Sequence, residues 1–235
     1  MMKPAPRYLK IAGLVSMLTL PAIFLLFFSQ AKHNFVVLPI YGEKIPVQKK
    51  QGEKMVNDTI YHTIPAWSFL DQDSNLVSDQ DYNNQIYIVD FFFTSCPSIC
   101  PKMTRQMLRL QWKLKDPAFD DVKLLSFTVD PSHDTPSRLK KYAEKNGADF
   151  SKWKFFTGDK RAIYELGVNG FLVSTQEDAL APGGFLHSEK FVLVDRKGQI
   201  RGFYDGTSTD DVNRCADEIK VLLKLEKIDA ARKQD

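Results

Sequence analysis

Residues 85–101 of the chain read QIYIVDFFFTSCPSICP, an apolar run followed by two cysteines. Residues 86–93 have the length and the branched and aromatic content of a buried strand. Cys96 and Cys100 follow directly, so we expect two thiols at the exposed end of a central strand, where a helix begins. Cys215 is the only other cysteine. The pair therefore indicates a functional site rather than a disulfide framework.

Pro101 limits the geometry of the cysteine pair. It cannot donate a backbone hydrogen bond, and it disfavours a helical conformation at Cys100. We expect residues 96–100 to form a turn or a 3₁₀ loop, with the regular helix starting at Pro101. Both thiols then lie near a helix N-terminus, where the positive end of the dipole favours thiolate.

Two reactive uses of the pair are open. Two thiolates suit a soft ion such as Cu(I), whereas a structural zinc ion takes four ligands. A redox dithiol, oxidised as a Cys96–Cys100 disulfide, is the other use. A purely structural disulfide is disfavoured, because so short a loop removes little entropy from the unfolded chain. A peroxidase is disfavoured as well, because it would need a single strongly activated cysteine.

Strand and helix patterns alternate on both sides of this stretch. They predict an α/β domain over residues 63–228, with a central mixed sheet flanked by helices, in an order that matches a thioredoxin-like domain. A polar tail follows at 229–235. The expected strands are 67–69, 86–93, 122–129, 153–156, 191–195 and 200–204, and the expected helices are 103–115, 136–146, 161–166 and 210–227.

The amino terminus has a different composition. Residues 9–28 carry a single charge, Lys10, which predicts a transmembrane anchor. The basic residues of 1–8 place that end in the cytoplasm and the folded domain on the periplasmic side. A cleaved signal peptide ending near Ala31 is the alternative, and it exports the same domain. Residues 29–62 are interpreted as a tether with at most one short strand.

The charge of the chain says little about its partners. The formal net charge is +3 and the basic residues are spread along the sequence, so no nucleic-acid partner is expected.

The histidines are the candidates for a third metal ligand. His187 follows a Gly183-Gly184 loop that faces the cysteine turn in a thioredoxin-like sheet. His133, after the strand at 122–129, is the second candidate. The other two, His33 and His62, are expected to be solvated.

Other polar residues have plainer interpretations. Asp130 either supports the ligands of the cysteine turn or only forms an Asp-Pro turn. Cys215 has helical spacing with apolar neighbours and is expected in the core. Four acids lack the spacing of a calcium loop and are expected in a hydrated hairpin: Asp71, Asp73, Asp79 and Asp81.

Several ordered motifs resemble the Sco/SenC family of copper proteins. Residues 92–101 resemble its cysteine motif, 128–136 its second motif and 155–158 its third, and His187 falls where the family places its ligand histidine. The resemblance covers residues 64–225. Two positions depart from the family pattern, because Ser98 replaces a common acid and Ser95 a frequent histidine. Neither removes a ligand.

This resemblance implies a thioredoxin-like domain, anchored by one transmembrane helix, that binds one copper ion, Cu(I) or Cu(II), through Cys96, Cys100 and His187. It implies a metallochaperone for the dinuclear copper centre of cytochrome c oxidase. The copper-binding subunit of that oxidase, and other copper carriers, are then the expected partners. The alternative is a membrane-tethered thiol–disulfide oxidoreductase, which uses Cys96 and Cys100 without His187.

Overall fold

The computed structural model describes residues 38–52, 54–173, 175–177 and 185–232, with residues 8, 16–17 and 19–21 near the amino terminus. The chain divides into two compact units, 1–37 and 38–235. Most of the predicted anchor at 9–28 and of the predicted cytoplasmic segment at 1–8 lies outside the described residues. Within the described residues, no helix has the length and apolar character needed to cross a bilayer.

A seven-stranded mixed sheet forms the centre of the second unit. Its strand order is β11-β10-β5-β6-β7-β3-β4. The three central strands are parallel, and antiparallel strands extend the sheet on both sides. The expected α/β domain with a mixed sheet is therefore confirmed. The strands are β3 (Ser68–Asp71), β4 (Leu76–Ser78), β5 (Ile86–Phe92), β6 (Val122–Thr128), β7 (Trp153–Thr157), β10 (Lys190–Val194) and β11 (Ile200–Asp205).

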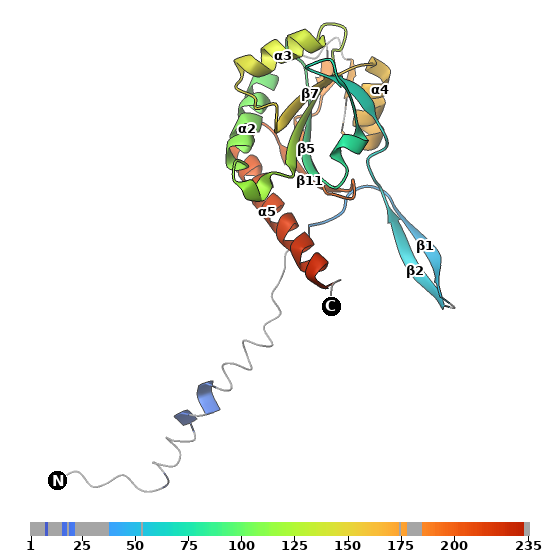
Figure 1. Cartoon of the computed structure of the whole chain (residues 1–235), viewed down its shortest axis with the longest axis vertical. Helices are drawn as coiled ribbons and strands as arrows, with labels where there is room; N and C mark the ends of the chain where they lie inside the picture. The colour runs from blue at the N-terminus through green and yellow to red at the C-terminus, as the bar shows by residue number, and fades with distance from the viewer. Residues whose placement is uncertain are drawn as a thin grey trace, which may run out of the picture. The chain divides into compact units, whose positions relative to one another are not determined.

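Helices cover both faces of this sheet. Figure 1 shows α2 (Cys100–Lys113) and α5 (Thr209–Arg232) on one side and α4 (Lys160–Glu165) on the other. The remaining helix, α3 (Pro136–Lys145), packs beside α2, since the Tyr142 and Thr104 hydroxyls lie 2.7 Å apart. The last helix is longer than expected, because α5 continues to Arg232, into the predicted tail.

Aromatic side chains fill the core on both faces of β5. All seven residues of the strand are buried, as expected for a strand covered on two sides. Phe91 stacks on Phe127 on one face, and Phe92 packs against Tyr142 of α3 on the other. The apolar run at 86–92 thus lies at the centre of the folded domain.

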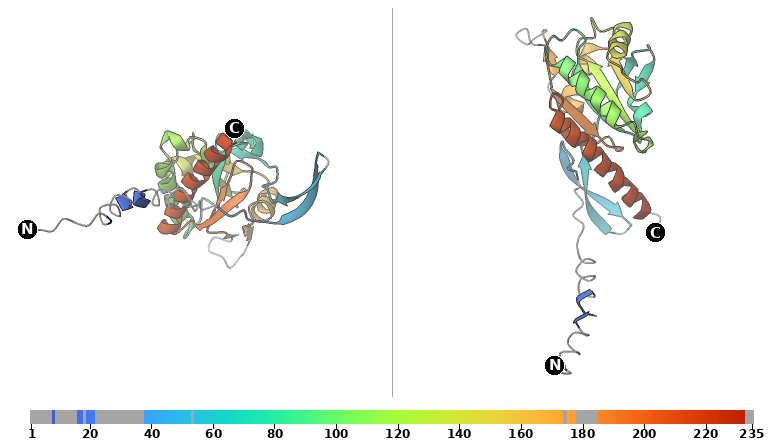
Figure 2. Two further views of the ribbon diagram at one scale, coloured as in Figure 1. Left: turned by 90° about the horizontal axis from the view of Figure 1, so that it is seen from below. Right: turned by 90° about the vertical axis from the view of Figure 1, so that its left-hand side faces the viewer.

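The tether prediction is wrong for residues 38–61. Strands β1 (Lys44–Gln51) and β2 (Lys54–Tyr61) pair antiparallel over their full length, and the hairpin stands away from the main sheet in Figures 1 and 2. Most of its described side chains are exposed, so it has no alternation of buried and exposed residues from which sequence could predict it.

The segment before the hairpin belongs to the folded domain. Leu38 is only 3% exposed, and Arg201 donates hydrogen bonds to the carbonyl oxygens of Leu38 and Pro39, at 2.7 and 3.1 Å. The backbone amide of Tyr41 also donates to Ile200 at 2.9 Å. The folded unit therefore begins at Leu38 and not at residue 63.

His62 is likewise not simply solvated. It is half-buried at the end of the hairpin, and its Nε2 lies 2.8 Å from the carbonyl oxygen of Gly170. This contact joins the hairpin base to the π-helical turn Leu166–Gly170.

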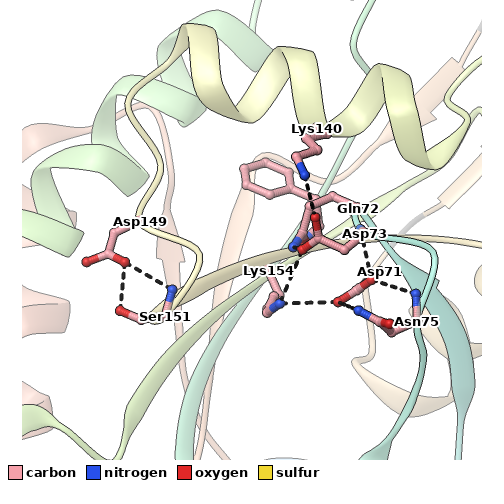
Figure 3. A network of polar contacts seen from close by, with 9 residues as sticks. Asp71, Gln72, Asp73, Asn75, Lys140, Asp149, Ser151 and Lys154 are labelled. Carbon is pink, nitrogen blue, oxygen red and sulfur yellow. Dashed lines mark hydrogen bonds and ion pairs between the residues drawn. The ribbon is translucent and has the colours of Figure 1, made fainter.

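The acidic hairpin between β3 and β4 is present, but Asp71 within it is buried (Figure 3). Its carboxylate accepts hydrogen bonds from the backbone amides of Asp73 and Asn75, both at 2.9 Å, and Lys154 lies 3.2 Å away. Burial alone would raise the pKa of Asp71, but the amide of Asn75 and Lys154 outweigh it and hold the pKa below its ordinary value.

Candidate metal centre

Cys96 lies in the turn between β5 and α2, and Cys100 is the first residue of α2. The amide of Cys96 donates to the carbonyl oxygen of Phe93 at 3.3 Å, which closes the turn. Helix α2 begins at Cys100, one residue before the predicted start, with Pro101 in its first turn, where the missing N–H costs nothing. A turn followed by a helix is therefore present, but the hydrogen-bonded turn lies at 93–96 instead of the predicted 96–100.

The two thiols differ in exposure, and they are not joined by a disulfide. Cys96 is 7% exposed and Cys100 is 1% exposed. The hydrogen bond that the Cys100 thiol makes to Cys96, followed by burial, raises the pKa of Cys100 far above its usual range. The expectation that the N-terminus of the helix favours a thiolate stays a prediction.

The backbone of His187 reaches the same edge of the sheet. Strand β10 runs antiparallel to β5 with Val192 opposite Val89, so the start of β10 lies beside the end of β5. His187 ends the short strand β9 (Phe185–His187), which pairs with β8 (Thr175–Glu177). Its side chain lies outside what the structure describes, as do residues 178–184, so its role as a ligand stays a prediction.

Asp130 and His133 form a turn after β6. The backbone carbonyl of Asp130 accepts from the amides of His133 and Asp134, and the Asp130 carboxylate lies 3.0 Å from Nδ1 of His133. Burial, then the charge of Asp130, raises the pKa of Tyr164 to about 12. The interpretation as an Asp-Pro turn is confirmed, and support of the metal ligands by Asp130 stays a prediction.

Asp134 lies within the motif at 128–136, which gives it no role of its own, and it is a further polar residue at this edge. Its side chain is fully buried. It accepts hydrogen bonds from the Thr94 amide at 2.9 Å and the Thr128 hydroxyl at 2.6 Å, and also from the Thr94 hydroxyl. Its signal in the sequence was an acid directly before the Thr135-Pro136 helix start, and nothing local linked it to a residue forty positions earlier.

Cys215 is a core residue, as expected. It is fully buried in α5, and burial raises the pKa of its thiol. It takes no part in the edge that carries Cys96 and Cys100.

The cysteine turn therefore supplies two soft sulfur donors at one edge of the sheet. Such donors suit Cu(I) or reversible disulfide chemistry. Among the side chains that the structure describes, no three His, Cys, Asp or Glu residues gather into a metal site. The side chain of His187 lies outside the described residues.

Comparison with known proteins gives one consistent family. Residues 57–224 match the family model described as SCO1/SenC. The chain is 31% identical over 173 residues to a SCO1 protein homolog of Bacillus subtilis (strain 168), covering 72% of this chain and 87% of that one. It is 30% identical over 142 residues to a putative copper-binding protein of Stutzerimonas stutzeri, covering 59% and 67% of the two chains.

A solved structure agrees with the sequence matches. The protein BsSco, described as a member of the Sco family of cytochrome c oxidase assembly proteins, superposes with a TM-score of 0.62 at 32% identity. The match covers 70% of this chain and 95% of BsSco. With the family model covering well over half of the sequence and a cysteine turn at the end of the central strand, this chain belongs to the SCO1/SenC family.

Proposed function

We propose that this protein is a copper metallochaperone that binds one copper ion through Cys96, Cys100 and His187. The observation that carries the proposal is the placement of two cysteines on one turn at the end of β5, with the His187 backbone at the same edge. The copper-binding name of the Stutzerimonas relative supports the metal. The description of BsSco supports the assembly of cytochrome c oxidase as the process.

Two thiolates and an imidazole form a donor set suited to copper. The cysteines belong to a turn and His187 to a short hairpin, so each ligand can leave the ion while the main sheet stays intact. Incoming cysteines of the copper-binding subunit of the oxidase would then replace the ligands one at a time. Oxidation of the dithiol removes two donors, so copper loading depends on the redox state.

Anchoring by residues 9–28, with the domain on the periplasmic side, is part of the proposal. Its support is the apolar composition of that segment and the basic residues before it. This topology puts the domain on the side of the membrane where disulfides persist.

A Cu(I) titration of the full, reduced chain against a competing chelator tests the proposal. We expect one tightly bound Cu(I) per chain, and loss of that binding in the double variant Cys96→Ser/Cys100→Ser. Cys215→Ala is the matched control, because it removes a buried cysteine far from the turn and retains binding. Unchanged stoichiometry in the double variant would contradict the proposal.

A thiol–disulfide oxidoreductase is the second candidate. The hydrogen bond between Cys96 and Cys100 favours it, because the two sulfurs are already close, as does the disulfide switch described for BsSco. His187→Ala separates the two functions. A metallochaperone loses copper binding in this variant, whereas an oxidoreductase keeps its dithiol activity. His133→Ala is the control, since His133 is an exposed histidine after β6, bonded to Asp130.

A further inference from the structure

We propose that Asp134 is a positioning residue for the cysteine turn, and that it acts through Thr94. The test below measures Cu(I) affinity, which rests on the proposed function, and the thiol–disulfide equilibrium, which does not. Asp134 lies forty residues after Thr94 in the chain, and it is fully buried.

The first contact fixes the backbone that leads into Cys96. Thr94 and Ser95 are the two central residues of the turn that the bond from Cys96 to Phe93 closes. The amide of Thr94 points away from that bond and donates to Asp134 at 2.9 Å. A buried amide needs an acceptor, and here the acceptor is supplied by a side chain from another loop.

A second contact fixes the Thr94 side chain. Nε of Arg138 donates to the Thr94 hydroxyl oxygen at 2.9 Å. The hydroxyl hydrogen is then available for Asp134, which accepts it. Thr94 is thus held by three hydrogen bonds whose donor and acceptor directions are all determined.

The same carboxylate joins the ends of β5 and β6. The Thr128 hydroxyl, at the end of β6, donates to Asp134 at 2.6 Å and accepts from the Asp130 amide at 3.1 Å. Arg138, from the first turns of α3, lies 3.7 Å from the carboxylate. Asp134 therefore connects the ends of β5 and β6 and the start of α3 at the point where the chain turns toward Cys96.

Only a carboxylate satisfies these partners. Asp134 accepts from three donors and faces a guanidinium group. Asparagine has one acceptor oxygen and an NH₂ that only donates, so in Asp134→Asn the bond to the Thr94 hydroxyl must reverse its direction and the negative charge facing Arg138 is lost. The variant keeps the shape of the side chain, but the directions of its hydrogen bonds are no longer fixed.

Thr94 is two residues from Cys96. If Thr94 becomes mobile, the position of the Cys96 sulfur therefore varies as well. Partners that orient a metal ligand typically change metal affinity by about 10- to 100-fold when removed. The dithiol–disulfide equilibrium depends on the relative placement of the two sulfurs in the same way.

The test compares four variants of the full chain: Asp134→Asn, Thr94→Val, Thr94→Ser and Asp71→Asn. Thr94→Ser keeps both the amide and the hydroxyl, and Thr94→Val loses the hydroxyl. Asp71→Asn is the matched control, because Asp71 is also a buried carboxylate holding two backbone amides, in the β3–β4 turn (Figure 3). Two quantities are measured: Cu(I) affinity and the thiol–disulfide equilibrium constant with glutathione.

We expect Asp134→Asn and Thr94→Val to change both quantities by about tenfold or more, and Thr94→Ser and Asp71→Asn to leave both within about twofold of the parent. Parent-like values in Asp134→Asn and Thr94→Val, or an equal change in Asp71→Asn, would overturn the proposal. If Asp134→Asn does not fold, the comparison of Thr94→Val with Thr94→Ser decides. If the parent binds no copper, the proposed function fails, and the glutathione equilibrium still decides the role of Asp134.

Discussion

Cys96 and Cys100 share one turn but differ as reactive groups. Cys96 is the more exposed, at 7% against 1%, and it lies in the turn before the helix. Cys100 is the first residue of α2, and the hydrogen bond that its thiol makes to Cys96, together with burial, raises its pKa. Cys96 is therefore the sulfur that an outside reagent or partner reaches first.

This difference predicts an order of modification. Brief treatment of the native, reduced protein with iodoacetamide at pH 8 labels Cys96 at least about tenfold faster than Cys100, since the thiolate is the nucleophile and access limits its rate. Cys215 stays unlabelled because it is fully buried. Mass spectrometry of the digested protein measures the order, and equal labelling of the two turn cysteines would contradict it.

For single residues, the sequence predicted those whose chemistry follows from the residue type and its neighbours in the chain. It missed those whose role depends on contacts with residues far away in the sequence. The cysteine pair and the buried Cys215 could be predicted because their neighbours in the chain determine their surroundings. Asp134 and His62 could not be, because Thr94 and Gly170 are far away in sequence and only the fold brings them into contact.

Among the secondary-structure elements, the β3–β4 turn is one whose contribution to the free energy of unfolding decreases in acid. Asp71 holds the turn through two backbone amides, and its pKa is lowered in the folded state from an ordinary value of 3.8. A carboxylate with a lowered folded pKa stabilises the fold above its unfolded pKa, and this stabilisation is lost as pH falls through the folded value.

Asp71→Asn should therefore lower the free energy of unfolding at pH 7 by about 1–3 kcal/mol, because Oδ2, which accepts from Lys154, is replaced by an NH₂ that only donates. The deficit relative to the parent should shrink as pH falls below about 4. Urea denaturation at several pH values measures both effects. Asp58→Asn, in the exposed ion pair with Lys49, is a control with little expected change. A deficit that does not depend on pH would refute the assignment.

Elements with a buried face were predictable, and those without one were not. The strand predicted at 86–93 is β5, and the helix predicted at 136–146 is α3, whose start Thr135-Pro136 marks. The hairpin of β1 and β2 was missed because its strands bury little surface. The helix predicted at 210–227 stops short of Arg232, where α5 ends.

For the molecule as a whole, the boundary of the fold lies at Leu38. Arg201 donates hydrogen bonds to Leu38 and Pro39. Tyr41 donates to Ile200, and the hairpin of β1 and β2 follows. The hairpin itself returns to the domain with the amide of His62 bonded to Glu43 at 2.9 Å.

These contacts predict unequal effects of two deletions. Removing residues 1–62 loses the burial of Leu38, about 1.5–3 kcal/mol, and the hydrogen bonds from Arg201, about 1 kcal/mol each. Replacing residues 44–61 by an Asn-Gly turn between Glu43 and His62 keeps these contacts and costs less than about 1 kcal/mol, because the hairpin buries little. Urea denaturation of the two proteins, each compared with residues 38–235, measures the difference. Equal losses would contradict the boundary.

The hairpin of β1 and β2 also affects the tendency of the protein to aggregate at high concentration. In the part of the chain that the structure describes, β1 and β2 pair only with each other, so each has an outer edge with unsatisfied backbone groups. Pro46 interrupts the edge of β1, as proline does at protected edges. β2 contains no proline and carries Val56, Thr59 and Ile60. At high protein concentration we therefore expect aggregation to start along β2, and we expect Val56→Lys to slow it.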